Sequence, residues 1–309
     1  MKILITGANG DIAISINKIL KKKFSKAIIH GSDININKKG NYYFEKILKV
    51  KQAGNYNYLN HLKKLLKLYD LIIPTTEQEI KYISQNIKKL DQQKILIHRS
   101  YILTNFLDKY KSFQFLKKYK INETGYCDRF INKSIIKRFP IIIKSRFGAG
   151  NKNYIRVKSK SELKKLILPK NRDYIYQEYI KSEKEYTSCI YKYDEFLKVI
   201  IFERILDRDK TFSAKVVNNF KIKKALTQFA HLINLKGSIN LQFRLKKSKL
   251  FIFDINPRLS STVLMRHLIG FQDCYWWITD FMNKKNSKKK FKKPTNNKIV
   301  RDEIIRLYD

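Results

Sequence analysis

The chain has 309 residues, 43% of them hydrophobic, and a formal net charge of +40. This length and apolar content predict a large buried core in one or two domains and exclude an intrinsically disordered chain. No run of about 18 consecutive apolar residues occurs, so we expect no transmembrane helix. The first apolar run is too short for a signal peptide, and the three widely spaced cysteines, Cys127, Cys189 and Cys274, are typical of reduced thiols in a cytoplasmic protein.

The positive charge alone does not define a partner. Lysines are spread along the whole chain and far outnumber arginines, while isoleucine and asparagine are abundant, as an AT-rich coding sequence would produce. We therefore favour a compositional background over a dedicated nucleic-acid or membrane surface. The densest basic run, residues 284–293, predicts a solvated linker.

In the first hundred residues, short apolar segments alternate with segments of helical spacing. We expect strands at residues 2–6, 27–33, 70–74 and 94–98, and helices at residues 11–20, 59–69 and 77–90. This alternation predicts a parallel sheet with right-handed crossovers, and so a Rossmann-like α/β domain over residues 1–104.

From about residue 105 the pattern changes to an α+β arrangement with antiparallel strands. We expect a helix at residues 107–119, a strand at 140–145, a glycine loop at 146–153, a strand at 154–157 and a helix at 159–167. Longer strands follow at residues 173–180, 185–193, 195–206, 237–245 and 249–256, with a helix at 218–234. We divide this half, residues 105–309, into a first subdomain (105–172) with the glycine loop and a second subdomain (173–309) that ends in the basic tail.

The last expected hairpin, residues 237–258, has one polar face near its end. Strand residues alternate between faces, so Asp254 and Asn256 point away from the apolar residues between and before them. Those apolar residues are Phe251, Phe253 and Ile255. To bring the apolar residues of both strands to one face, we expect a three-residue loop at 246–248, which places Gln242 diagonally next to Asp254.

This polar face has the chemistry of a magnesium–phosphate site. A carboxylate from Asp254 and amide oxygens from Gln242 and Asn256 form a set of hard oxygen ligands, which Mg²⁺ prefers. Pro257 cannot donate a hydrogen bond to the strand ladder, so it ends the strand there. Arg258 then supplies a fixed positive fork for a phosphoryl oxygen.

The segment "GSINLQF…FIFDINPRLSST" resembles the ATP-grasp carboxylate–amine ligases, in particular stand-alone proteins similar to carbamoyl-phosphate synthase large-subunit halves. The resemblance covers nearly the whole chain and implies a Rossmann-like pre-ATP-grasp domain followed by an ATP-grasp fold of two α+β subdomains. In that family the residues at the positions of Gln242, Asp254 and Asn256 ligate Mg²⁺. The residue at the position of Arg258 contacts the transferring phosphate. The family acid is more often glutamate, so Asp254 leaves one or two metals open.

Other motifs occur in the order of the family. "LDKYKSFQFLKK" resembles the helix whose basic residue, here Lys109, touches ATP phosphates. "FPIIIKSRFGAGNKN" resembles the strand and glycine loop, with Lys144 as the second phosphate lysine and, with Arg258, a catalytic residue. Gly148 and Gly150 would let backbone amides approach the triphosphate closely.

The adenosine end of the resemblance lies in two short segments. "YQEYI" is similar to the hinge that holds adenine, which assigns Glu178, Tyr179 and Ile180 to the adenine edge. In "EKEYTS", Glu185 matches the acid that binds the ribose hydroxyls. The family commonly has a short glycine turn between these segments, whereas this chain has "KSEK".

The turn "ITGANGDIA" supports a rival hypothesis, an NAD(P)-dependent nucleotide-sugar dehydratase or epimerase. Gly7 and Gly10 follow a strand and open a helix, and Asp33 closes the next strand as a ribose-binding acid does. Such an enzyme needs a Tyr-x-x-x-Lys pair, and two occur, beginning at Tyr42 and Tyr154. Because pre-ATP-grasp domains also open with this turn, we interpret both glycines as backbone geometry.

We predict an ATP- and Mg²⁺-dependent ligase that joins a carboxylic acid to an amine or amino acid through an acyl phosphate, with Mn²⁺ as a possible replacement. The expected partners are small-molecule carboxylate and amine substrates, and a homodimer is left open. A basic nucleic-acid-binding protein is a further alternative, which steeply salt-dependent binding would favour. An ATP-binding but inactive homologue is another.

Overall fold

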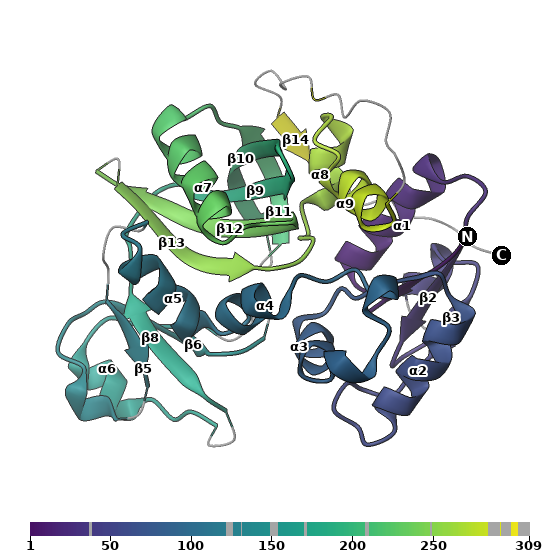
Figure 1. Ribbon diagram of the computed structural model, residues 1–309. Helices are drawn as coiled ribbons and strands as arrows, with labels where there is room; N and C mark the ends of the chain where they lie inside the picture. Colours follow the sequence, from purple (N-terminus) through teal and green to yellow (C-terminus); the bar gives the residue numbers. More distant parts are fainter. Residues whose placement is uncertain are drawn as a thin grey trace.

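The computed structural model describes residues 1–36, 39–121, 126–130, 132–148, 154–169, 172–207, 210–247, 249–283, 291 and 298–301. Within these residues the chain forms three sheets, which Figure 1 shows with their helices. The predicted linker at 284–293 lies outside the described residues except for Phe291. No helix in the described ranges is both long enough and apolar enough to cross a membrane.

The first sheet is parallel and has the strand order β3-β2-β1-β4. Its strands are β1 (Lys2–Thr6), β2 (Ile28–Asp33), β3 (Ile47–Lys49) and β4 (Leu71–Ile73). Its helices are α1 (Asp11–Lys23), α2 (Tyr58–Leu68) and α3 (Glu77–Gln85), with 3₁₀ turns at Lys39–Tyr42 and Ile87–Lys89. The parallel α/β prediction is confirmed, although β3 was not expected.

The strand expected at residues 94–98 is wrong. After a 3₁₀ turn at Gln92–Lys94, only Ile95 bridges to Ile72. The chain then leaves the sheet, because His98 lies against the largest sheet, where its Nε2 atom is 2.8 Å from the carbonyl oxygen of Ser238.

A smaller antiparallel sheet follows, with the order β5-β8-β6-β7. Helices α4 (Ser100–Phe106) and α5 (Lys109–Lys118) lead to β5 (Cys127–Arg129), a 3₁₀ turn (Lys133–Ile135), β6 (Ile141–Ser145), β7 (Ile155–Val157), α6 (Lys160–Lys165) and β8 (Tyr174–Glu178). The predicted boundary at 104/105 falls inside α4. Since β8 pairs with β5 and β6, the first subdomain's sheet continues past the predicted division at 172/173.

The largest sheet is antiparallel and has the order β13-β12-β9-β10-β11-β14. It contains β9 (Glu185–Tyr193), β10 (Phe196–Asp207), β11 (Lys210–Val216), β12 (Gly237–Lys246), β13 (Lys249–Asn256) and β14 (Lys298–Val300). The helices of this part are α7 (Phe220–Leu232), α8 (Val263–Leu268) and α9 (Asp273–Phe281). The core of the first sheet continues into this part, since Ile16 of α1 and Val263 of α8 belong to one buried cluster.

The hairpin β12–β13 pairs in a register that differs from the prediction. Asn240 lies opposite Asn256, and Gln242 lies directly opposite Asp254 rather than diagonally. At the other end Lys246 pairs with Lys249, so two residues rather than three connect the strands. Gln242 and Asp254 are therefore direct cross-strand neighbours, closer together than the diagonal placement that the sequence predicted.

A bulge at Phe253 causes this difference. The register shifts after Gln242, so Phe243 pairs with Ile252 and Phe253 becomes the extra residue. Beyond the bulge the faces are exchanged, and Ile252 lies in the core with Leu250. The predicted core position of Phe253 is therefore wrong, which frees its side chain for the cavities described next.

Candidate active site

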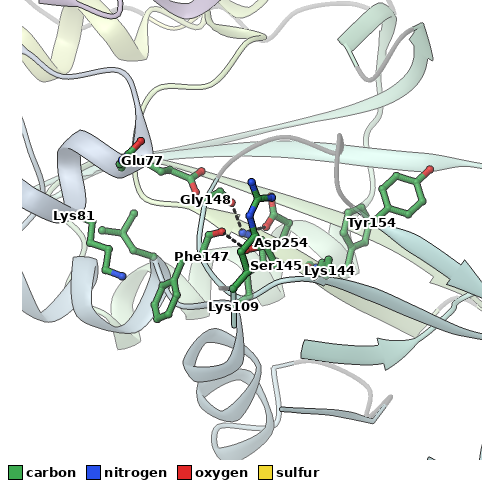
Figure 2. A pocket seen from close by; sticks show the side chains of 13 residues that line it. Glu77, Lys81, Lys109, Lys144, Ser145, Phe147, Gly148, Tyr154 and Asp254 are labelled. Carbon is green, nitrogen blue, oxygen red and sulfur yellow. Dashed lines mark hydrogen bonds and ion pairs between the residues drawn. The ribbon is translucent and has the colours of Figure 1, made fainter. Parts of the chain in front are cut away.

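Two adjoining cavities lie between the smaller sheet and the largest sheet. The first has a volume of about 390 Å³ and the second of about 300 Å³. They share three lining residues, Lys144, Tyr154 and Phe253. The two cavities therefore adjoin at these residues, and together we call them the cleft; Figure 2 shows the first cavity.

The second cavity brings together the four residues predicted for adenosine. Glu178, Tyr179 and Ile180 line it at the end of β8, and Glu185 lines it from the start of β9. Apolar walls are provided by Ile142, Leu206 and Phe253. A cavity with apolar walls and a few polar groups suits a nucleobase and its sugar.

The first cavity holds the two predicted phosphate lysines and the predicted metal acid. Lys109, Lys144, Gly148 and Asp254 all line it (Figure 2). Lys109 Nζ donates to the carbonyl oxygen of Gly148 at 2.6 Å and lies 4.0 Å from Asp254 Oδ1. Lys144 Nζ donates to the carbonyl oxygen of Phe253 at 2.7 Å. The predicted loop residue Gly150 lies outside the described residues.

A buried clamp joins α5 to the start of the glycine loop. Asp108 caps α5 by accepting from the amides of Tyr110 and Lys111. Its two oxygens also accept from Arg146 Nε at 2.9 Å and Nη2 at 2.7 Å, and the Lys109 amide donates to the Arg146 carbonyl. Burial alone would raise the pKa of Asp108, but the hydrogen bonds and charge of Arg146, together with the amides of Lys111 and Tyr110, outweigh burial and lower it. The clamp was not predicted; the N-cap position of an aspartate before a helix was its only sequence signal.

The charges in the first cavity influence one another. Burial lowers the pKa of Lys144 to about 8, and Lys109 adds to this effect while Asp254 opposes it. Burial acts to raise the pKa of Asp254, but the charges of Lys109 and Lys144 outweigh it, so the pKa falls below its usual value. Asp254 is therefore ionised at neutral pH and can offer a carboxylate to a cation.

The three predicted metal ligands have different hydrogen-bond partners in the structure. Asn256 Nδ2 donates to Asp254 Oδ2 at 2.8 Å, so these two side chains lie together. The amide oxygen of Gln242 instead accepts from Arg204 Nη2 at 2.9 Å. Among the residues that the structure describes, no three His, Cys, Asp or Glu side chains group as a metal site. A metal held here would therefore need the amide oxygens as well as Asp254.

Glu185 is paired with two arginines that the sequence did not assign to it. Its Oε1 accepts from Arg204 Nη2 at 2.6 Å, and its Oε2 accepts from Arg244 Nη2 at 2.9 Å. Arg244 Nη1 also donates to the carbonyl oxygen of Ile180 at 2.9 Å. Arg244 thus ties both ends of the "KSEK" loop together, at the place where the family commonly has a glycine turn.

Arg258 lies beside the predicted metal ligand Asn256 but lines neither cavity, and it pairs with the first domain. Its Nη2 atom donates to Asn256 Oδ1 at 3.2 Å and to Glu77 Oε1 at 2.9 Å. Glu77 lies at the start of α3 and lines the first cavity. The sequence pattern gave no signal for this pair, because a first-turn glutamate is ordinary in a helix.

The backbone amides of the N-terminal glycine turn already have hydrogen-bond partners within the protein. The amides of Ala8, Asn9 and Gly10 donate to Ser32 O, Asp33 Oδ2 and Gly7 O respectively. These amides are therefore engaged within the protein, which favours the interpretation of both glycines as backbone geometry.

The Tyr-x-x-x-Lys pairs also lack the geometry that the dehydratase hypothesis needs. Tyr42 ends a 3₁₀ turn, and Tyr154 and Lys158 flank the strand β7. Neither pair lies on an α-helix, where residues four apart would face the same way.

Comparisons with known proteins agree with this geometry. Residues 171–303 match the family described as "ATP-grasp in the biosynthetic pathway with Ter operon". The N5-carboxyaminoimidazole synthetase from Staphylococcus aureus has a similar fold, with a TM-score of 0.70 and 15% identity over 97% of this chain and 79% of that chain. The chain has an ATP-grasp-like fold.

Two further solved structures share this fold. The biotin carboxylase domain of the Hydrogenobacter thermophilus 2-oxoglutarate carboxylase, in complex with MgADP, ADP and bicarbonate, has a TM-score of 0.71 and 15% identity over 93% of this chain and 70% of that chain. The L-amino acid ligase from Bacillus licheniformis has a TM-score of 0.69 and 12% identity over 91% of this chain and 74% of that chain. No curated protein sequence matches the chain.

Proposed function

We propose that this protein is a member of the ATP-grasp family and an ATP- and Mg²⁺-dependent ligase that joins a carboxylic acid to an amine or amino acid. The observation that carries the proposal is that the residues matched to adenosine and the lysines matched to phosphate line two adjoining cavities around Lys144. The fold similarity to an L-amino acid ligase supports the same class of reaction.

In this proposal ATP lies along the whole cleft. Adenine occupies the slot beside Tyr179 and Ile180, with Glu178 and Glu185 at its polar edge. The triphosphate extends past Lys144 towards Lys109 and the backbone of Gly148. Two ammonium groups and a glycine with space around it are well suited to a polyanion.

Asp254 would hold the magnesium ion, and Asn256 and Gln242 would join it once their amide oxygens released Arg258 and Arg204. The ionised carboxylate and the adjacent amide of Asn256 fit the oxygen preference of Mg²⁺. When bound, the ion supplies positive charge next to the phosphates. Mn²⁺ uses the same ligand types and is a reasonable substitute.

The reaction would proceed in two steps. The substrate carboxylate attacks the γ-phosphorus in line, which breaks the bond to ADP and gives an acyl phosphate. The Arg258 guanidinium stabilises the charge on the transferring group. An amine then attacks the acyl carbon, phosphate leaves and the amide forms, so no covalent protein nucleophile is required.

A substrate screen tests this function. Amino acids and sugar acids, singly and in pairs, are incubated with MgATP, and ADP and phosphate are measured. We expect at least one pair to release ADP in step with a new amide product, and Asn256→Ala to abolish this release while the fold survives. The control Asn86→Ala removes an amide that bonds within its own helical segment, and its activity should remain. Failure of MgATP to bind at all would contradict the proposal.

A further inference from the structure

Among the residues that line the first cavity, Glu77 is the one acidic residue that comes from the first domain. This cavity is the end of the cleft proposed to hold the phosphates. It lies in the first turn of α3, where Thr76 caps the helix by accepting from the Glu79 amide. The Glu77 side chain is buried, with 7% exposure, and lines the first cavity (Figure 2). Its position is therefore fixed by a capped helix rather than by a loose loop.

A chain of polar contacts runs from Glu77 through the site. Glu77 Oε1 accepts from Arg258, which also donates to Asn256 Oδ1. Asn256 donates in turn to Asp254, and Asp254 lies 4.0 Å from Lys109 Nζ. The first domain is thus connected to the groups proposed for metal and phosphate.

The Arg258 side chain retains an unused donor. Arg258 is 9% exposed, its Nη1 donates to the Leu259 carbonyl, and its Nη2 is shared between Glu77 and Asn256. Within the described part of the chain, Arg258 Nε is buried and has no hydrogen-bond partner. A buried donor without a partner is costly, so its orientation needs a reason.

We propose that Glu77 is a positioning residue, which holds the Arg258 guanidinium so that its free Nε–H meets the γ-phosphoryl group of ATP. A guanidinium is planar, so fixing Nη2 from one side also fixes the direction of Nε. The inference rests on the proposed function, since it requires a nucleotide in the cleft. It assigns to the first domain a role in phosphate recognition through one ion pair.

The alternative role for Glu77 is to hold two domains together. Arg99 provides a matched control, because its Nη2 donates to the Asn234 carbonyl and so links the first domain to the connection between α7 and β12. Neither Arg99 nor Asn234 lines either cavity, whereas Glu77 lines the first. If Glu77 acted only in domain contact, Arg99→Ala would reproduce the effect of Glu77→Gln.

Binding of MgATP and MgADP to Glu77→Gln tests the inference, because orientation and charge predict opposite signs. Removing the negative charge of Glu77 would by itself tighten the binding of both nucleotides. Losing the orientation of Arg258 should instead weaken MgATP by roughly fivefold, about the effect of one net hydrogen bond, and leave MgADP within about twofold. MgATP and MgADP differ only in the γ-phosphate, so a change in the ratio of their dissociation constants locates the effect at the γ-phosphate.

The outcomes separate the two proposals. The positioning role is supported if Glu77→Gln binds MgATP more weakly and MgADP unchanged. Arg99→Ala should not show this effect, and adding Glu77→Gln to Arg258→Gln should not produce it either. Tighter binding of both nucleotides, or an equal change in both, overturns it while the ligase proposal stands. Absence of nucleotide binding in the unmodified protein would overturn both.

Discussion

The two glycine turns of the chain look alike in sequence but are built differently. At Gly7 an added Cβ would lie 2.7 Å from Thr75 Oγ1, and the following amides are bonded within the protein. Among the residues that the structure describes, an added Cβ at Gly148 would meet nothing within 4 Å, and two lysines line the same cavity. A glycine turn therefore favours phosphate only where space and cations accompany it.

Two carboxyl groups near these turns differ in the same way. Glu79 is buried below the first turn, where it accepts from the hydroxyls of Thr6 and Tyr58, and burial raises its pKa. Asp254 lies in the cleft, and burial there is outweighed by Lys109 and Lys144, so its pKa is lowered. The first region stabilises a neutral acid, whereas the second stabilises an anion.

The largest expected effect contrasts Arg258 with Asn9. Arg258→Ala removes the positive fork beside the metal residues and should slow ADP formation by roughly 10³-fold. Asn9→Ala removes side-chain bonds to Asn35 O and to the Gly40 amide, and should cost about 1–2 kcal/mol of stability with no loss of activity. Steady-state ADP assays and urea unfolding measure both. Comparable activity losses in the two variants would break the contrast between the regions.

The two glycines give a matched pair of substitutions. Gly7 has a φ of 64° and no space for a side chain, so Gly7→Ala should lower the free energy of unfolding by roughly 2–3 kcal/mol. Gly148 has a φ of 95° but open surroundings, so Gly148→Ala should cost about 1 kcal/mol and weaken MgATP binding. Thermal unfolding and nucleotide titration separate the effects, and weaker nucleotide binding in Gly7→Ala would contradict us.

The charge of Lys144 should give nucleotide binding its own pH dependence. With a pKa of about 8, Lys144 is charged below that pH and neutral above it. MgATP affinity should therefore fall by about tenfold between about pH 7 and pH 9. Lys144→Met should bind more weakly at every pH without this fall, and an unchanged profile in the variant would remove the assignment.

The smallest expected effect concerns Glu79. Because its pKa is raised in the folded protein, the folded state binds more protons than the unfolded one above the usual carboxyl pKa of 4.5, so this residue's contribution to stability falls as pH rises. Glu79→Gln lacks this titration, and its stability relative to the unmodified protein should increase from about pH 4.5 upwards. Urea unfolding at several pH values checks the slope. A parallel pH dependence in both proteins would show that Glu79 is ionised in the fold.

The sequence predicted the elements with strong periodicity well. Strand β9 was expected at the residues where it forms, and the polar series ending in Arg258 was found from side-chain alternation. The failures have local physical causes. Ile95 makes only a bridge because the chain turns towards Ser238, and Phe253 is displaced from the core by a bulge. Short strands such as β5 carry too few residues to show a period.

The sequence alone predicted a parallel α/β part followed by an antiparallel part, and it singled out Asp254 and Arg258 by residue type and spacing. Lys109 and Lys144 came from the resemblance to a known family. The sequence could not determine partners, because a contact such as Glu77–Arg258 joins residues 181 positions apart and leaves no periodic trace. Only the packing of the three sheets decided which amides were already bonded and which charges met. Periodicity records how one segment meets the core, whereas the geometry of a site depends on how separate segments meet one another.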